Sequence, residues 1–402
     1  MGASLANGGG ALANWVVQAQ LAVGIAVKLC TIRQRQADLI SRAPEDNAQT
    51  IRCRHPAHPP SNRWTNTAQE DALKVLVTGG AGYIGSTVAS ACLDYGITPV
   101  VLDDESTGRA EFAAGRSSFR GDVADHTLLD EILDTHDIDA TVHCAARTAV
   151  PESVTDPLGY YRTNVAKTVE LVDHLQQRGV DRFVYSSSAS IYSPGSDLTV
   201  DENSALAPAS PYARTKLMVE GVLADAAVAH SIRVISLRYF NPIGADPQLR
   251  SGPQSPSPGH ALGRLLHAYE AGQPFTITGT KWPTRDGTGL RDYIHVWDLA
   301  RAHIAALQQF DGVVPTERCY EVINLGTGRG TTVRELVSVL EAVVGESLRI
   351  VEADPRPGDV IGCCTRSDKA ARLLHWAPEL TTEDGIRDAL AWSRRRRDVL
   401  GI

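Results

Sequence analysis

A tyrosine and a lysine stand four residues apart, at Tyr212 and Lys216, in a segment that begins with a helix start signal, Ser210-Pro211. Residues at positions i and i+4 of a helix lie on one face, so the phenol and the ammonium would be neighbours. A phenol ionises near pH ~10 in water, but a cation at about 4–6 Å favours the phenolate and lowers that pKa. The pair is therefore a candidate for taking a proton from a hydroxyl group. The alternative interpretation is an ordinary pair of surface side chains.

A row of three serines, Ser186 to Ser188, follows a short apolar segment at residues 182–185. Open α/β sheets bind their ligands beyond the carboxyl ends of their strands. One hydroxyl there can hydrogen-bond the oxygen that is oxidised and pass its proton to Tyr212. We expect Ser186 to have only a structural role in the loop, and we consider the same role for Ser187.

A glycine-rich turn between two short apolar strands predicts a dinucleotide site. The strand at residues 74–78 runs directly into Gly79, Gly82 and Gly85. These glycines permit a tight turn, a close approach of the backbone to a pyrophosphate, and close packing of the next helix, whose positive end faces the phosphates. A second strand ends at Asp103, about twenty residues later. A carboxylate there binds the adenosine ribose and repels a 2′-phosphate, which favours NAD over NADP.

The elements that must position these groups alternate between strands and helices from residue 73 onward. Such alternation predicts a doubly wound parallel α/β sheet of the Rossmann kind. We expect an NAD-binding domain over residues 72–241, and a smaller mixed α/β lobe over residues 242–402 that is interleaved with it. Besides the two strands already named, the predicted strands lie at 117–120, 140–144, 182–185 and 234–238, and later helices at 128–135, 156–178 and 211–230.

Composition excludes several classes of protein. With 43% hydrophobic and 21% charged residues, the 402-residue chain has an ordinary globular composition. Its net charge of −8 gives no general basic surface, which argues against nucleic acid as a partner. We interpret the run of four arginines at 394–397 as the solvated end of the last helix. The seven cysteines are scattered without a Cys-x-x-Cys pair, so we expect a reducing, cytoplasmic environment.

The first 71 residues differ in character from the rest. Their apolar stretch at 11–30 is interrupted by polar and charged residues and lacks a basic start, so we predict neither a membrane span nor a signal peptide. Cys53, His55 and His58 lack a fourth ligand for a metal ion. We expect this segment to be an extension without ordered structure, and we predict no metal and no membrane partner.

From about Lys74 onward, the chain resembles the extended short-chain dehydrogenases/reductases, and most closely the UDP-galactose (UDP-glucose) 4-epimerases. Because several separated motifs occur in one order, the resemblance is specific. The stretches that carry it lie at 77–85, 186–189, 210–216, 237–245, 286–295 and 356–359.

The resemblance implies roles for individual residues. It makes Ser188, Tyr212 and Lys216 the catalytic residues. It places around NAD the residues Gly79, Gly82, Tyr83, Ile84, Gly85, Asp103, Asp122, Val123, Ala145, Asn164, Lys216 and Tyr239. It places around the UDP-sugar the residues Ser188, Tyr212, Asn241, His260, Arg291, Arg356, Asp359 and Cys363. Guanidinium groups suit a diphosphate, although either arginine can instead pair with a nearby aspartate.

Three residues depart from the pattern of the family. Thr148 stands near the place of a usual lysine that touches the cofactor, so either Arg147 takes over that contact or NAD is held less tightly. Ser193 replaces a common glycine, and Thr278 replaces an aromatic residue. We therefore expect altered packing around the sugar or the uracil.

The implied reaction is reversible inversion at C4 of UDP-glucose and UDP-galactose through a transient 4-keto sugar, with tightly bound NAD and a homodimeric enzyme. Cys363 lies where the family places a gate to the sugar pocket, and its small side chain would also admit UDP-GlcNAc and UDP-GalNAc. Alternatives are an epimerase or decarboxylase of UDP-glucuronate or UDP-xylose, and a nucleotide-binding sensor without catalysis. A 4,6-dehydratase is disfavoured because the serine row contains no acid.

Overall fold

The computed structural model describes residues 72–193, 195–255, 259–355 and 360–401. The predicted extension at 1–71 lies outside these residues, as do Arg356 and Asp359.

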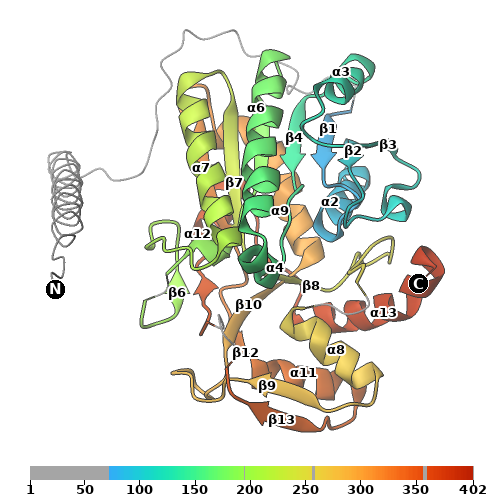
Figure 1. Cartoon of the computed structure of the whole chain (residues 1–402), viewed down its shortest axis with the longest axis vertical. Coiled ribbons are helices and arrows are strands. Elements are labelled where there is room, and N and C mark those ends of the chain that lie inside the picture. Colours follow the sequence, from blue (N-terminus) through green and yellow to red (C-terminus); the bar gives the residue numbers. More distant parts are fainter. Residues whose placement is uncertain (1–71, 194, 256–258, 356–359, 402) are drawn as a thin grey trace, which may run out of the picture. The chain divides into compact units, whose positions relative to one another are not determined.

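A seven-stranded parallel sheet forms the centre of the larger part of the fold (Figure 1). Its strands lie in the order β11-β7-β5-β4-β1-β2-β3. The chain winds outward from β1 first on one side and then on the other, so the order switches between β1 and β4. Crevices at such a switch point hold the ligand in open α/β sheets. The strands are β1 (Lys74–Thr78), β2 (Thr98–Asp103), β3 (Ser117–Arg120), β4 (Ala140–His143), β5 (Arg182–Ser186), β7 (Arg233–Tyr239) and β11 (Tyr320–Leu325).

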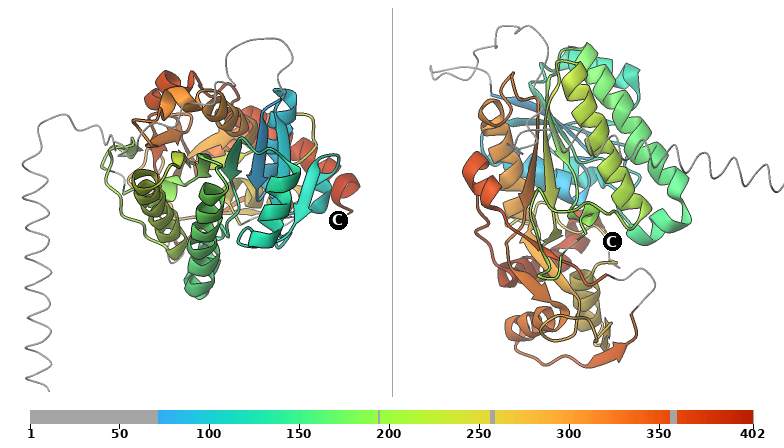
Figure 2. Two further views of the ribbon diagram at one scale, coloured as in Figure 1. Left: turned by 90° about the horizontal axis from the view of Figure 1, so that it is seen from above. Right: turned by 90° about the vertical axis from the view of Figure 1, so that its left-hand side faces the viewer.

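Helices cover both faces of this sheet, which is why its central strands are apolar throughout. Alternate residues of β1 point to opposite faces: Val75 and Val77 pack in one cluster of buried side chains and Leu76 in another. The right-hand view of Figure 2 shows α6 and α7 on one side of the sheet and α9 on the other. The helices are α2 (Tyr83–Asp94), α3 (His126–Thr135), α6 (Lys167–Gln177), α7 (Pro211–Ala229), α9 (Val296–Gln308) and α12 (Asp368–Leu374).

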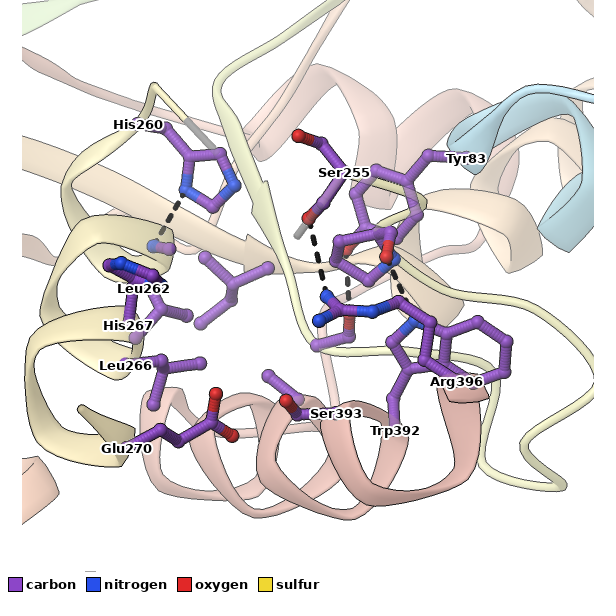
Figure 3. Close-up of a pocket in the computed structure, with 15 residues that line it drawn as sticks. Tyr83, Ser255, His260, Leu262, Leu266, His267, Glu270, Trp392, Ser393 and Arg396 are labelled. Carbon is purple, nitrogen blue, oxygen red and sulfur yellow. Dashed lines mark hydrogen bonds between the residues drawn. The ribbon is translucent and has the colours of Figure 1, made fainter. Parts of the chain in front are cut away.

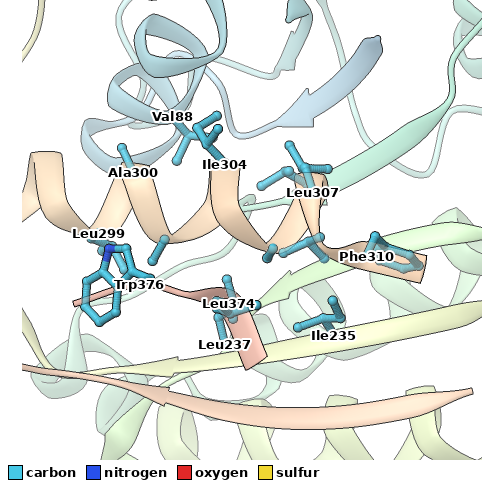
Figure 4. Close-up of a cluster of buried hydrophobic side chains, with 14 of the residues drawn as sticks. Val88, Ile235, Leu237, Leu299, Ala300, Ile304, Leu307, Phe310, Leu374 and Trp376 are labelled. Atoms are coloured by element: carbon cyan, nitrogen blue, oxygen red, sulfur yellow. The ribbon is translucent and has the colours of Figure 1, made fainter. Parts of the chain in front are cut away.

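The first of these clusters joins segments that lie far apart in the chain. Val88 of α2 packs with Leu299 and Ile304 of α9 and with Trp376, which follows α12 (Figure 4). Burial of such side chains contributes roughly 1.5–3 kcal/mol each. The cluster therefore fixes the glycine-rich turn and α2 against elements from the C-terminal half.

A smaller mixed lobe lies beside the carboxyl ends of the strands (Figure 1). Its three-stranded sheet has the order β12-β10-β8, and two two-stranded sheets pair β9 with β13 and β6 with β14. The strands are β6 (Thr199–Val200), β8 (Asn241–Ile243), β9 (Phe275–Thr278), β10 (Leu290–His295), β12 (Gly330–Thr332), β13 (Ile350–Ala353) and β14 (Cys364–Thr365). Its helices are α8 (Ala261–Glu270), α11 (Val333–Val344) and α13 (Thr382–Leu400).

Short helices connect the larger elements. They are η1 (Ala110–Ala113), α4 (Val150–Thr155), α5 (Pro157–Tyr161), η2 (Arg162–Ala166), η3 (Ala189–Ile191) and α10 (Phe310–Val313). The predicted helix at 156–178 is thus α5, η2 and α6 in succession, and η2 is a π-turn. Such turns occur often at functional sites.

The predicted fold class, a doubly wound parallel sheet with a smaller mixed lobe, is confirmed. Ser210 caps α7 as expected, since its side chain accepts a hydrogen bond from the backbone of Ala213 at 3.1 Å. Within the described residues, none of the helices combines the length and the apolar character needed to cross a bilayer.

Candidate functional site

The glycine-rich turn forms a close-fitting backbone cradle between β1 and α2. Gly79 has φ +71°, and a Cβ atom there would lie 2.6 Å from the backbone nitrogen of Ala145. A Cβ atom on Gly85 would overlap the carbonyl oxygen of Gly79. Gly82 precedes α2 without a side-chain cap, so the first N–H groups of the helix, including those of Tyr83 and Ile84, remain available for an anion. The geometry suits a pyrophosphate.

Asp103 lies beside this cradle at the end of β2. Its carboxylate accepts hydrogen bonds from the backbone N–H of Ala81 at 2.9 Å and of Glu105 at 2.8 Å. Burial raises its pKa, while these two hydrogen bonds oppose the rise. Because a carboxylate has about four lone-pair sites, it can still accept bonds from ribose hydroxyls. The donor set therefore fits the adenosine half of NAD.

Asp122 and Val123 follow β3 farther along the same edge. The Asp122 carboxylate accepts a hydrogen bond from the backbone N–H of Ala124 at 3.0 Å and pairs with the Lys167 ammonium. Val123 packs against buried side chains of the sheet. The side chains of both residues are thus engaged within the protein, which leaves the backbone of this turn for contacts with an adenine.

The predicted catalytic residues meet at the ends of β5 and α7. Burial raises the pKa of Tyr212, and the interaction of its hydroxyl with the Ser188 hydroxyl opposes that rise. The Ser188 hydroxyl also lies 2.9 Å from that of Ser190. The Lys216 ammonium donates to the carbonyl oxygen of Ser186 at 2.7 Å. Burial lowers the pKa of Lys216 to about 8.

The two other serines of the row have partners inside the protein. The Ser186 hydroxyl lies 3.1 Å from Nε2 of His303 and 3.2 Å from the Cys144 sulfur. The Ser187 hydroxyl donates to the Glu220 carboxylate. Burial raises the pKa of Tyr239 well above its ordinary value, and a hydrogen bond to Ser186 opposes this rise.

Asn164 lies in the π-turn η2 and connects the loop after β4 to helix α7. Its amide exchanges hydrogen bonds with the backbone N–H and carbonyl of Arg147 at 2.8 and 3.0 Å, and it donates to the Thr215 hydroxyl at 3.1 Å. The Arg147 guanidinium pairs with Glu152 and Asp156, each at 2.7 Å. Since its charge is already paired, Arg147 is poorly placed to make the cofactor contact expected of the lysine that usually stands near Thr148.

The predicted substrate residues of the lobe lie on β8, β10 and the segment after residue 359. Asn241 faces Tyr293 across the β8–β10 pair. The Arg291 guanidinium donates to the carbonyl oxygens of Ile361 at 3.0 Å and Val360 at 3.1 Å. Among the described residues, Arg291 thus holds the backbone that follows residue 359 and pairs with no aspartate.

Cys363 and His260 lie at other borders of this region. Cys363 is a free, partly buried thiol that packs against a cluster formed by Ala189, Ile191, Tyr192, Val200 and Phe240. The cluster includes Ala189, the residue that follows Ser188. His260 caps α8, accepting a hydrogen bond from the backbone of Gly263 at 3.1 Å, and burial lowers its pKa.

Comparison with known proteins supports this arrangement. Residues 75–326 match the NAD dependent epimerase/dehydratase family. A UDP-glucose 4-epimerase of Azospirillum brasilense is 41% identical over 334 residues, which cover 82% of this chain and 94% of that protein. The chain belongs to the UDP-glucose 4-epimerase family. A UDP-glucose 4-epimerase of Bacillus subtilis is 36% identical over 331 residues, 80% of this chain and 96% of the relative.

Solved structures of UDP-glucose 4-epimerases share the fold. The enzyme from Stenotrophomonas maltophila, solved with NAD and formylated UDP-arabinopyranose, has a TM-score of 0.76 and 33% identity and covers 81% of this chain and 99% of its own. The enzyme from Brucella ovis with NAD has a TM-score of 0.74 and 36% identity, over 80% and 98% of the two chains. The NAD-dependent family and its cofactor, expected from the motifs, are thus confirmed.

In this epimerase a cavity lies between α8 and α13, and the described residues that line it do not include the serine row (Figure 3). Tyr83 and His260 line it, together with the apolar side chains of Leu262, Leu266 and Trp392. The Tyr83 hydroxyl donates to the carbonyl oxygen of Gly244 at 2.8 Å. The side chain of Tyr83 therefore ties α2 to the loop after β8, and only its backbone faces the glycine cradle.

Sequence reasoning missed three buried polar residues of this epimerase: Glu220, Arg238 and Tyr293. Glu220 and Arg238 form an ion pair with side chains only 4% and 6% exposed. Their signal was present, because Glu220 stands four residues after Lys216 and Arg238 lies within the 237–245 motif. The Tyr293 hydroxyl is buried and has no hydrogen-bond partner among the described residues.

Proposed function

We propose that this chain inverts C4 of a UDP-linked hexose, interconverting UDP-glucose and UDP-galactose with tightly bound NAD. The observation that carries the proposal is the contact of Tyr212 with Ser188, next to the buried ammonium of Lys216. This cluster stands at the carboxyl ends of the strands, as does the glycine cradle. The relatives named above, UDP-glucose 4-epimerases matched over four fifths of this chain, support the same activity.

Each residue of the cluster has a defined task. Tyr212 takes the proton from the sugar 4-hydroxyl and later returns it, while Ser188 orients that oxygen through its own hydroxyl. The Lys216 ammonium favours the phenolate form of Tyr212. NAD, held in the glycine cradle, would supply the acceptor and donor for the hydride of C4. Arg291, with Arg356 from outside the described residues, holds the diphosphate while the 4-keto sugar turns.

The cofactor fits the cradle described above. Gly79, Gly82 and Gly85 would hold the pyrophosphate, Asp103 the ribose, and Lys216 and Tyr239 the nicotinamide end. Because the hydride returns to the sugar, turnover consumes no NAD.

Turnover without an added oxidant tests the proposal. Purified protein incubated with UDP-galactose alone should form UDP-glucose, detected by chromatography of the nucleotide sugars. Protein that retains NAD and binds UDP but converts neither sugar would instead support the sensor without catalysis.

A wider substrate range is supported by Cys363. Its thiol is small and packs against the cluster that contains Ala189, where a phenol ring would need more space. We therefore include UDP-GlcNAc and UDP-GalNAc among the substrates. UDP-glucuronate is disfavoured, because Arg147, the extra cation that its carboxylate would need, is already paired with two carboxylates. UDP-xylose has no carboxylate and stays an alternative. A panel of these UDP-sugars, scored for C4 epimers, separates the possibilities.

We also propose a homodimer in the cytoplasm. Large apolar side chains are exposed on neighbouring helices α4 to α7, namely Val154, Leu158, Val169 and Met218. Exposed apolar patches of this kind mark protein interfaces. The five cysteines within the described residues are free thiols, as a reducing compartment favours. Light scattering on the purified protein would give the oligomeric state.

A further inference from the structure

A connected network of buried polar groups lies behind the serine row, and the proposed reaction does not use it directly. At its centre, the Arg238 guanidinium donates to the two carboxylate oxygens of Glu220, from Nε at 2.9 Å and from Nη2 at 2.6 Å. A bidentate fork of this kind fixes both side chains in one geometry.

One branch of the network leads from Glu220 to the catalytic residues. The Ser187 hydroxyl donates to Glu220, and Ser187 directly precedes Ser188. Glu220 also follows Lys216 by one turn of α7, so the two side chains lie on the same face. The placement of Ser188 and the charge beside Lys216 therefore both depend on Glu220.

The other branch leads from Arg238 to the wall of the sugar site. Arg238 Nη1 donates to the Tyr192 hydroxyl at 2.8 Å, and that hydroxyl donates to Asn324 at 2.6 Å. The Asn324 amide donates to the Thr365 hydroxyl at 2.9 Å. Thr365 lies two residues beyond Cys363. The chain of hydrogen bonds thus runs from the catalytic strand end to the segment proposed to border the sugar.

We infer that Glu220 and Arg238 are positioning residues, which hold Ser188 and Lys216 in register with the 363–365 segment across the site. The inference rests on the proposed function. Stability alone is a weak reason for such a pair, because replacing both partners of a buried ion pair by apolar groups is often neutral or stabilising. A fixed geometry at the reacting centre is a stronger reason for such a pair.

The charge of Glu220 provides the first test. Glu220→Gln keeps the size of the side chain and an acceptor for Ser187, but removes the carboxylate. We expect kcat to fall roughly 10- to 100-fold, the size of effect that a displacement of about 1 Å can cause.

The pH profile should change as well. Burial lowers the pKa of Lys216, and the Glu220 carboxylate opposes this, so its removal lowers that pKa further. Lys216 then loses its proton at a lower pH, and the alkaline limb of kcat moves to lower pH. The groups that face Lys216 are His143, Cys144, Tyr185, the Ser186 carbonyl, Tyr212 and Glu220.

Tyr192→Phe tests the other branch. It keeps the ring beside Arg238 and removes the hydroxyl that reaches Asn324. We expect KM for UDP-galactose to rise roughly two- to tenfold, the size of one hydrogen bond, with kcat nearly unchanged. The affinity for UDP-glucose, measured by calorimetry, should weaken in parallel and requires no turnover.

Two further variants separate positioning from stability. Arg233 lies at the other end of the same strand and pairs with Asp181 at 2.8 Å and Asp311 at 2.6 Å. Arg233→Met should lower Tm but leave kcat, KM and the pH profile unchanged. The double variant Glu220→Met/Arg238→Met removes both buried charges. It should fold with a Tm near that of the wild type and still show the lower kcat and the shifted limb.

Assays of the full chain from about pH 6 to 10 distinguish a positioning role from a purely structural one. If Glu220→Gln does not fold, the double variant gives the same readouts. The inference is overturned if the wild type is active and the Glu220 and Tyr192 variants change only Tm. A wild-type chain without epimerase activity would contradict the proposed function instead, and the calorimetric comparison would still test the second branch.

Discussion

The Lys216 ammonium and the carbonyl oxygen of Ser186 lie 2.7 Å apart, in a hydrogen bond that joins the catalytic helix α7 to the end of β5. Because this partner is a neutral oxygen, it holds the lysine in place without neutralising its positive charge. Only 3% of the residue is exposed, so water screens this charge little. A buried cation one helical turn from Tyr212 is what a phenolate base needs.

Tyr212→Phe should abolish turnover while leaving the binding of NAD and UDP nearly intact. The variant removes only the proton acceptor, and general acid–base groups typically contribute roughly 10²–10⁴-fold to the rate. The measurement is conversion of UDP-galactose alongside the NAD content of the purified protein. Near-full activity of the Phe variant would show that another group is the base.

Asp103→Ala should relax the preference for NAD over NADP. The substitution removes the acceptor for the ribose and the repulsion of a 2′-phosphate, and it also frees the Ala81 N–H in the glycine turn. Asp104→Ala is the matched control, since that exposed carboxylate bonds only with Ser106 in the described structure. Reconstitution with each cofactor measures the preference, and equal selectivity in all three proteins would refute the assignment.

Cys363→Tyr should selectively remove activity toward N-acetylated sugars. A phenol ring placed among Ala189, Tyr192 and Phe240 would occupy space that the thiol leaves open, and close-packed sites tolerate little overlap. Cys364→Ser, at the adjacent position, serves as a control. Rates with UDP-GlcNAc and UDP-galactose are compared in each variant. A wild-type enzyme inert toward N-acetylated sugars would contradict the gate.

Stability should fall in acid through His143. Its Nδ1 lies 2.7 Å from the Thr78 hydroxyl and its Nε2 lies 2.9 Å from that of Thr168, and burial lowers its pKa to about 3. Below pH ~6.5 this histidine is protonated in the unfolded chain but stays neutral in the folded chain. The free energy of unfolding therefore falls by up to about 1.4 kcal/mol per pH unit until the folded pKa is reached. Stability from this group is therefore complete above pH ~6.5 and declines as the pH falls.

His143→Gln should reduce that decline, because the amide can replace both hydrogen bonds without titrating. Urea unfolding at about pH 7 and 5 would show a difference of up to roughly 2 kcal/mol between the two proteins. Equal acid sensitivity would mean that His143 is not the group responsible. His303, whose pKa burial lowers to about 4, adds a similar dependence that both proteins share.

The sequence predicted the first six strands of the large sheet because each is short and followed by a recognisable turn or helix, and all but β3 are largely apolar. It did not place β11, since Tyr320–Leu325 has no local feature that distinguishes a central strand from one in the lobe. Its partner β7 lies about eighty residues earlier, and such pairing depends on packing that no local pattern contains.

The serine row, Tyr212 and Lys216 could be proposed as site residues from the sequence, because their chemistry depends on residue types and short spacings. The Glu220–Arg238 pair was not identified, since its partners come from segments that are brought together only by the fold. Likewise, the pairing of Arg147 with Glu152 and Asp156 depends on the loop geometry that Asn164 sets.

The parallel pairing of β11 with β7 has a consequence for dissecting this protein. The lobe is built from two parts of the chain, because β8, α8, β9 and β10 precede β11, whereas β12, α11, β13 and α13 follow it. A fragment that ended at residue 241 would leave β7 as a bare edge, and unpaired strand edges recruit other chains. Transplanting the lobe onto another member of the family therefore requires moving both parts, with α9, β11 and α12 retained by the recipient.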